Sequence, residues 1–287
     1  MSMSGEKHLS RRPGEQSPDT DETDLASSLD ELPLWSAPFG LLLLETVRLR
    51  KDCVALDIGC GTGFPLIELA QRLGPTCKVY GIDPWETAVA RAREKIAAWG
   101  IESAHVILGK AEQLPLGNGS IDLIVSNNGI SNTQDPQQVF AECYRVCRAS
   151  AQLVMTYNLP ETMREFYGVF EETLRALSLA DRIGEMKKHI HAKRMPLDEM
   201  KGLLSRSGFR IMNVVLDSFT LRYADGTTML AHSLIRNGFR EPWQDILGEE
   251  ERSRFFGKLE ANLNKYSQRH GELALTIPFA CIDCVKE

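Results

Sequence analysis

The sequence predicts an α/β protein whose mostly parallel sheet is covered by helices on both faces. From residue 53 onward, short apolar runs alternate with longer segments of helical periodicity, which is typical of such a sheet. The 287 residues, 43% of them hydrophobic, are enough for one large domain or for a core domain with a cap. We expect seven strands, at residues 53–58, 78–82, 105–108, 121–125, 152–157, 209–216 and 273–285.

Glycine and proline mark the ends of the helices expected between these strands. In residues 65–73, apolar side chains recur on one face, Pro65 suits the first turn and Gly74 suits the end. A further helix begins near Ser36, a suitable N-cap, with Pro38 in its first turn. The remaining helices are expected at residues 85–99, 136–146, 162–180, 197–207, 228–236 and 249–264.

The formal net charge of −6 is concentrated in the N-terminal segment. Residues 1–33 carry three basic and eight acidic side chains, which leaves residues 34–287 with a net charge of only −1. Because residues 1–33 also lack an aliphatic pattern, we predict a disordered acidic tail there and a folded domain over residues 34–287.

Composition excludes several classes of protein. The acidic balance disfavours a generally basic nucleic-acid binder, and the leucine run at residues 41–44 is far shorter than the ~20 residues of a membrane span. The polar N-terminus does not resemble a secretory signal. Seven scattered cysteines, an odd number, favour a reducing cytoplasm over a disulfide framework.

The strongest motif is a glycine loop at residues 56–63, which read Leu-Asp-Ile-Gly-Cys-Gly-Thr-Gly between a strand and a helix. Glycines let the backbone approach a ligand, and the helix N-terminus supplies free N–H donors. Dinucleotide-binding loops need Gly-x-Gly-x-x-Gly, but Phe64 breaks that spacing. Asp83 ends the next strand about twenty residues later, where ribose hydroxyls bind. The loop therefore predicts an adenosine cofactor other than a dinucleotide.

Over residues 35–157 these motifs resemble class I S-adenosylmethionine-dependent methyltransferases, in particular the ubiquinone/menaquinone-biosynthesis-like (methyltransferase type 11) group. The resemblance implies a Rossmann-like seven-stranded sheet and S-adenosyl-L-methionine as cofactor, with S-adenosyl-L-homocysteine as product. It also implies that Asp83 binds both ribose hydroxyls and that an apolar residue after Pro84 packs on adenine. The cofactor residues implied are Asp57, Gly59, Cys60, Gly61, Thr62, Gly63, Asp83, Pro84, Trp85, Lys110, Ala111, Glu112, Ser126 and Asn127.

The chain departs from the family pattern in two places. Lys110 stands where an aspartate usually accepts a hydrogen bond from the adenine amino group, and lysine cannot accept one. That contact must shift to Glu112 or to the backbone, or be absent. The usual Pro-Gly-Gly turn after the helix at residues 136–146 reads Arg-Ala-Ser at residues 148–150.

Catalytic residues are weakly marked because methyl transfer from a sulfonium mainly needs alignment and exclusion of water. A base is needed only if the acceptor holds a proton. Our candidates are Asn128 and Tyr157 at strand ends, and His189 and His191 in the basic segment at residues 187–194. The alternatives are ordinary turn residues and a solvated helix end.

We expect the segments at residues 159–194 and 223–270 to form a helical cap over a small-molecule acceptor, either anionic or aromatic, methylated at oxygen, nitrogen or carbon. The segment at residues 127–129 lacks the Asn-Pro-Pro-aromatic motif of nucleic-acid amino-methylating enzymes, so no nucleic-acid partner is expected. No metal is expected, because Cys281 and Cys284 would point to opposite faces of a strand. A cofactor-binding scaffold without turnover and a thiol-dependent metalloid methyltransferase remain alternatives, and the oligomeric state stays open.

Overall fold

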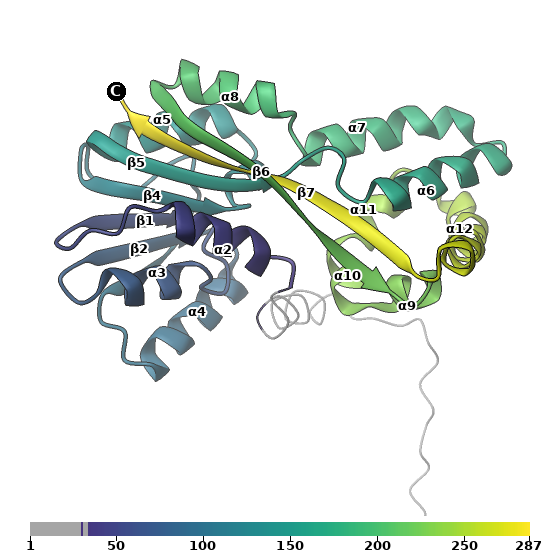
Figure 1. Cartoon of the computed structure of the whole chain (residues 1–287), viewed down its shortest axis with the longest axis horizontal. Helices are drawn as coiled ribbons and strands as arrows, with labels where there is room; N and C mark the ends of the chain where they lie inside the picture. The colour runs from purple at the N-terminus through teal and green to yellow at the C-terminus, as the bar shows by residue number, and fades with distance from the viewer. Residues whose placement is uncertain (1–29, 31–33) are drawn as a thin grey trace, which may run out of the picture.

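A computed structural model describes Asp30 and residues 34–287. The tail predicted at residues 1–33 lies outside the described residues, apart from Asp30. In Figure 1 the chain forms two lobes, one built on the sheet and one built mainly of helices. Two long strands run from the first lobe into the second and connect them.

The sheet has seven strands in the order β3-β2-β1-β4-β5-β7-β6. Strands β1 to β5 pair in parallel, whereas β7 is antiparallel to both of its neighbours, β5 and β6. This topology confirms the predicted mostly parallel, Rossmann-like class. The strands are β1 (Val54–Ile58), β2 (Lys78–Asp83), β3 (Ala104–Leu108), β4 (Ile121–Asn127), β5 (Cys147–Asn158), β6 (Phe209–Tyr223) and β7 (Leu273–Lys286).

Helices cover both faces of the sheet lobe. On one face, α2 (Ala37–Thr46) packs against β4, β5 and β7, whereas α3 (Leu66–Leu73) and α4 (Glu86–Ala98) pack against β2 and β3. On the other face, α5 (Pro136–Val146) packs against α8 (Leu197–Arg206), and α8 lies on β6. The helix α3 ends at Gly74, whose φ of +81° suits glycine, as the sequence predicts.

The helical lobe, which we call the cap, forms from the two segments that sequence analysis set apart (Figure 1). Its helices share one apolar core, in which Phe170 of α6 lies 4.5 Å from Phe255 of α12 between ring centroids. The ends of β6 and β7 enter the same core through Phe219 and Leu275. The cap comprises α6 (Arg164–Ala176), α7 (Ile183–Lys193), α9 (Gly226–Ala231), α10 (Ser233–Gly238), α11 (Arg240–Gln244) and α12 (Glu249–His270).

Several boundaries differ from those that the sequence predicts. The helix expected at residues 228–236 is two short helices, because His232 between them has an extended backbone with ψ of 135°. Strand β6 continues seven residues beyond Leu216, through polar Asp217 and Ser218. It does so because its pairing with β7 extends into the cap, as far as Tyr223 opposite Leu273.

The glycine loop packs backbone to backbone against the turn that follows β4. Gly59 has a φ of +76°, and a Cβ placed on it would lie 2.5 Å from Cα of Gly129. A Cβ on Gly129 would lie 2.1 Å from the Ile58 carbonyl oxygen. Glycine is therefore required on both sides of this contact. The sequence singles out Gly59 but not Gly129, because the partner turn carries no glycine-loop motif.

Substituting Gly129 by alanine should destabilise the protein by about 1–3 kcal/mol, since the new methyl group cannot fit without backbone movement. Gly168→Ala is the matched control, because Gly168 is exposed on α6 with no neighbouring atom within 4 Å of its Cβ position. The control should be neutral or stabilise by up to about 1 kcal/mol. Chemical unfolding of both variants checks this, and equal effects would contradict the close contact.

Candidate functional site

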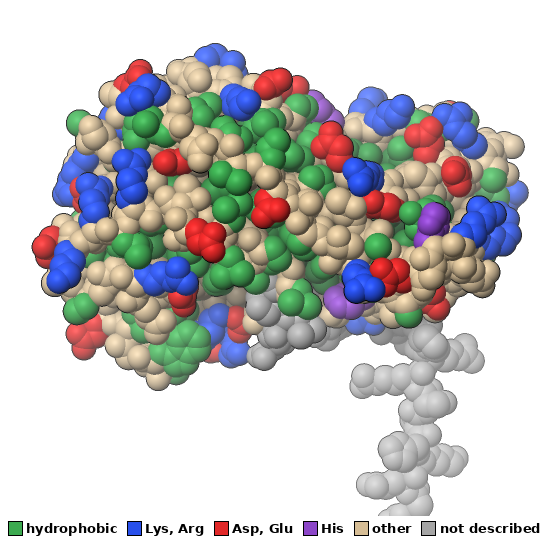
Figure 2. All heavy atoms as spheres, viewed as in Figure 1, with side chains coloured by type: hydrophobic (Ala, Val, Ile, Leu, Met, Phe, Trp, Pro, Cys, Tyr) green, Lys and Arg blue, Asp and Glu red, His purple; other side chains and the backbone are tan. Residues whose placement is uncertain are grey.

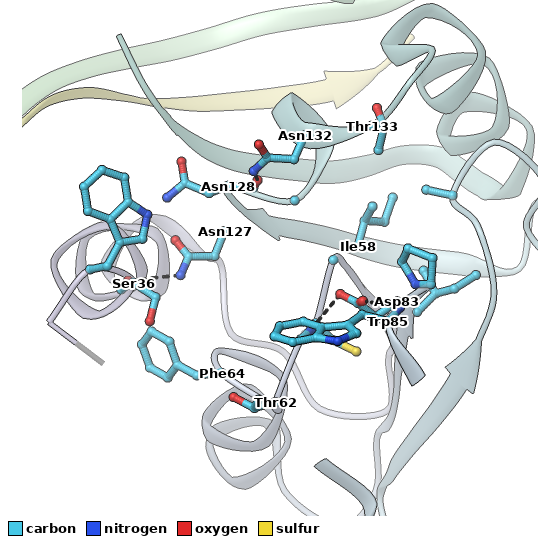
Figure 3. Close-up of a pocket in the computed structure, with 18 of the residues that line it drawn as sticks. Ser36, Ile58, Thr62, Phe64, Asp83, Trp85, Asn127, Asn128, Asn132 and Thr133 are labelled. Carbon is cyan, nitrogen blue, oxygen red and sulfur yellow. Dashed lines mark hydrogen bonds between the residues drawn. The ribbon is translucent and has the colours of Figure 1, made fainter. Parts of the chain in front are cut away.

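The main cavity lies at the carboxyl ends of β1, β2 and β4 and has a volume of about 940 Å³. Ligands of open α/β sheets bind at this edge, and the volume falls within the range of small-molecule sites. Figure 3 shows the labelled side chains of the glycine loop, of β2 and of the turn after β4 around this space. We call it the cofactor cavity.

Asp83 holds the glycine loop and the start of α4 together. One carboxylate oxygen accepts the backbone N–H of Gly61 and the other accepts that of Trp85, both at 2.9 Å (Figure 3). Burial raises the pKa of Asp83, and these two donors act in the opposite direction. Each carboxylate oxygen can accept a further hydrogen bond, so Asp83 retains the capacity to bind two ribose hydroxyls.

The glycine loop turns its open side to the cofactor cavity. Gly59, Cys60, Gly61 and Thr62 line it, and a Cβ on Gly61 would meet no atom within 4 Å. Gly63 lies outside the lining residues and instead packs against Ile67 of α3. The free space beside Gly61 fits the close approach of a cofactor to the backbone.

The Cys60 thiol faces away from the cofactor cavity. A Cβ on Gly81 of β2 would lie 2.8 Å from its sulfur, so the side chain points into the core below the loop. Burial raises the pKa of this thiol far above its ordinary value. Cys60 therefore lines the cavity through its backbone and stays a neutral thiol.

Asp57 lies beneath the loop and is not among the described residues that line the cofactor cavity. Its side chain is fully buried, and both carboxylate oxygens are shielded from solvent. Burial, with a smaller contribution from Asp83, raises the pKa of Asp57 to about 8 against the opposing effect of the Leu66 backbone N–H. The carboxyl group is therefore neutral at pH 7 in the cofactor-free protein.

Asp57→Asn should change how stability depends on pH. The folded-state pKa of about 8 lies above the ordinary value of 3.8, so wild-type stability should fall as the pH rises between these values. The fall is at most about 1.4 kcal/mol per pH unit, and the variant should lack it. Urea unfolding without cofactor from pH 5 to pH 8 checks this. Parallel pH profiles for the two proteins would contradict the buried neutral carboxyl.

An aromatic and aliphatic wall forms one side of the cofactor cavity. Pro84 and half-buried Trp85 line the cavity next to Asp83. Trp99, at the end of α4, also lines it and is 60% exposed. Sequence analysis did not single out Trp99, because a lone tryptophan before Gly100 resembles an ordinary helix end.

Asp30 is the one residue of the predicted tail that the structure describes. It lines the cofactor cavity and forms ion pairs with Lys95 and Arg91 of α4, the latter at 2.7 Å. Burial alone raises the pKa of Asp30, but hydrogen bonds to both cations lower it overall. These contacts depend on distant residues, so composition could not predict them.

The third motif surrounds the adenine side from β3. Lys110, Ala111 and Glu112 all line the cofactor cavity. One carboxylate oxygen of Glu112 accepts the backbone N–H of Gln134 at 3.2 Å, so this side chain also holds the turn before α5. Because Lys110 stands where the family usually has an aspartate, Glu112 is the residue of this motif that brings a carboxylate to the cavity.

Ser126 and Asn127 at the end of β4 are both engaged in protein contacts. The Ser126 hydroxyl donates to the Ile58 carbonyl at 2.9 Å and lies outside the cavity lining. Asn127 lines the cofactor cavity, but its amide donates to the Ser36 carbonyl and accepts from Thr156. Asn127 therefore fixes the start of α2 beside the cavity.

A second cavity of about 180 Å³ lies under the cap, and we call it the cap cavity. It shares five described lining residues with the cofactor cavity, so the two spaces adjoin. The shared residues are Trp35, Asn128, Asn132, Gly238 and Phe239. The cap cavity is completed by Asn158, His189, Lys193, Arg194, Pro242 and Trp243.

Two of the four catalytic candidates line the cap cavity. Asn128, with a φ of 60°, accepts the Asn158 N–H, and His189 is half-buried on α7. Burial, together with Arg194 and Lys193, lowers the pKa of His189 to about 4 against the opposing effect of Asp245. His189 is therefore neutral at pH 7.

The other two candidates lie outside both cavities. His191 is exposed and lies 3.7 Å from Glu199. Tyr157 is fully buried in the core of the sheet lobe, because its position on β5 points away from the cavity edge. We therefore leave Tyr157 and His191 out of the proposed site.

Metal ligands do not gather among the described residues, and the closely spaced Cys53 and Cys77 thiols, 3.5 Å apart, lie outside both cavities. No group of three His, Cys, Asp or Glu side chains in that part of the chain could hold a metal ion. Cys281 and Cys284 lie in different core clusters, on opposite faces of β7, as the strand period predicts.

Among the described residues, no helix is long and apolar enough to cross a membrane. Figure 2 shows acidic and basic side chains interspersed over the visible face.

Known proteins match the sheet lobe. A family model described as a methyltransferase domain matches residues 56–155. An uncharacterised 37.1 kDa protein of a Streptomyces fradiae transposon is 35% identical over 134 residues, 46% of this chain and 38% of that protein. A demethylmenaquinone methyltransferase from Geobacillus stearothermophilus is 34% identical over 106 residues, which are 37% of this chain and 45% of that protein. The chain thus spans less than half the length of these curated relatives.

The fold is also found in solved structures. A SAM-dependent methyltransferase from Aquifex aeolicus superposes with a TM-score of 0.52 at 22% identity, covering 66% of this chain and 91% of that one. Fold and cavity residues resemble those of class I S-adenosylmethionine-dependent methyltransferases. Residues 56–155 match the methyltransferase domain model, and part of the chain is similar to demethylmenaquinone methyltransferases, in agreement with the resemblance. The cap lies outside the matched residues.

Proposed function

We propose that the protein transfers a methyl group from S-adenosylmethionine to a small molecule enclosed by the cap. The observation that carries this proposal is the pair of adjoining cavities. The first offers Asp83 and the glycine loop to an adenosine cofactor, and the second lies between the turn after β4 and the cap. An enzyme that joins two small molecules needs such neighbouring, water-excluding sites.

The chain's part in this reaction is binding and alignment. When bound, the cofactor supplies a methyl carbon that the acceptor attacks in line while the carbon–sulfur bond breaks and its electron pair passes to sulfur. Asp83 holds the ribose, and Trp85 packs on the adenine. Trp35 and Phe239, shared by both cavities, position the acceptor and exclude water. Where the acceptor carries a proton, neutral His189 is placed to accept it.

The acceptor that best fits the site is a small molecule with an aromatic or other apolar body. Trp35, Phe239 and Trp243 supply flat apolar walls to the cap cavity. The match to the demethylmenaquinone methyltransferase covers only 37% of this chain and 45% of that protein, so its acceptor is not carried over to this chain. Oxygen, nitrogen and carbon remain open as the methylated atom.

Two alternatives make different predictions. A scaffold would bind the cofactor without turnover. A thiol-dependent metalloid enzyme needs several thiols at the acceptor, but Cys60 is the one cysteine among the described lining residues and its thiol points away.

We also propose a cytoplasmic location, which the seven free, buried cysteines support.

Asp83→Ala should weaken S-adenosylmethionine binding by roughly hundredfold to ten-thousandfold, because it removes two hydrogen bonds to a charged partner, each worth about 1.5–3 kcal/mol. The matched control is Asp122→Asn. Asp122 also accepts a backbone N–H, that of Val54, but lies at the opposite end of the sheet. Calorimetry should show unchanged affinity in the control.

The same proteins should then be assayed with methyl-labelled cofactor against ring-bearing phenols, amines and carboxylic acids. We expect label transfer by the wild type and loss of transfer at low cofactor concentration in Asp83→Ala. Absence of cofactor binding by the wild type would overturn the proposal. Binding without transfer to any acceptor would favour the scaffold.

A further inference from the structure

Arg194 is a buried cation with no acidic partner among the described residues. It lies directly after α7, only 3% of its surface is exposed, and none of the ion pairs in that part of the chain includes it. Its Nη1 donates to the Tyr167 hydroxyl at 3.3 Å, and its Nε has no hydrogen-bond partner among the same residues. Buried charges in proteins are normally paired, so this guanidinium is suited to an anion that arrives with a ligand.

A second free donor faces the same cavity from the sheet lobe. The Asn158 N–H donates to Oδ1 of Asn128, which identifies Nδ2 as the other end of the amide. This Nδ2 is buried and has no partner among the described residues. Asn128 and Arg194 both line the cap cavity, one from the turn after β4 and the other from the cap. Two residues from different elements, each with a buried and unpartnered donor, therefore line one small space.

The charged side chains that line this space are all basic. Lys193 and Arg194 line the cap cavity with His189, and no aspartate or glutamate is among its described lining residues. Lys193 forms no ion pair within the described part of the chain. Besides burial, Arg194 and Lys193 lower the pKa of His189, and Asp245 raises it. The positive charge of the two cations is therefore felt at the imidazole.

The guanidinium is held in a fixed position before any ligand binds. It lies over the Tyr167 ring, with 5.3 Å from its central carbon to the ring centroid. The Trp243 indole N–H donates to the same Tyr167 hydroxyl at 3.0 Å, and Trp243 stacks on Phe166 at 4.1 Å. A donor fixed in this way loses little entropy on binding an oxyanion.

We propose that the cap cavity binds an oxyanion of the methyl acceptor, a carboxylate or a phosphate ester, through Arg194 and Asn128. The guanidinium fork matches the two oxygens of such a group. The apolar body of the acceptor then passes Trp35 and Phe239 toward the cofactor cavity. The assignment of this anion to the acceptor rests on the proposed function, whereas anion binding itself does not.

The test measures binding of three probes to protein saturated with S-adenosylhomocysteine, by ligand-observed NMR titration. Phenylacetate and phenyl phosphate represent the two oxyanions, and phenylacetamide is the neutral counterpart of phenylacetate. We expect at least one anion to bind roughly tenfold or more tightly than phenylacetamide. The anion that binds more tightly decides between carboxylate and phosphate.

Arg194→Gln should weaken the bound anion by roughly tenfold to hundredfold and abolish the preference over phenylacetamide. Arg194→Lys keeps the charge but not the two-pronged guanidinium geometry, so its anion affinity should lie between those of the wild type and Arg194→Gln. Lys187→Gln removes one charge from the exposed side of α7, outside both cavities, and should change nothing. Unchanged affinity for S-adenosylhomocysteine shows that each variant is folded.

The inference is overturned if no probe binds, if phenylacetamide binds as well as both anions, or if Arg194→Gln leaves anion binding unchanged. These failures would leave the proposed function intact as long as S-adenosylhomocysteine binds. Conversely, Arg194-dependent anion binding by a protein that fails to bind S-adenosylhomocysteine would support the anion site and contradict the proposed function.

Discussion

The two hydrogen bonds that Asp83 accepts from backbone N–H groups are the constraint on which the rest of the site depends. They join the end of β2, the glycine loop and the start of α4, while the Gly59 N–H donates to the Ile82 carbonyl beside them. Because the loop is fixed from below, Gly59 can approach Gly129 and leave the space beside Gly61 open. The same carboxylate therefore shapes the cavity and presents its remaining lone pairs to a ligand.

The second requirement is that the cap covers the cavities, and the long pair of strands β6 and β7 holds the cap in that place. Near its end β7 belongs to the core of the sheet lobe, and near its start, at Leu273, it belongs to the core of the cap. Continuous pairing with β6 over this length makes the connection stiff rather than a flexible linker. The cap is thereby held at the carboxyl edge of the sheet, where Arg194 and Phe239 can face the turn after β4.

Local patterns were sufficient to predict the fold and several residues that line the cofactor cavity. The glycine loop, Asp83 and the motif at Lys110 to Glu112 each lie on one short segment next to a strand end, and all reach the cavity. What the sequence could not show is produced by contacts between distant segments. The roles of Trp99 and Asp30 are examples, as is the separation of His189 from His191, since only the packing of α7 decides which histidine faces inward.

The most direct test of the central claim, two adjoining sites shared between the sheet lobe and the cap, is a crystal structure with S-adenosylhomocysteine. We expect both ribose hydroxyls within hydrogen-bond distance of Asp83, the adenine against Trp85, and the sulfur facing Asn128 at the boundary with the cap cavity. An adenosine bound inside the cap cavity, or a sulfur directed away from Asn128 toward solvent, would contradict the account.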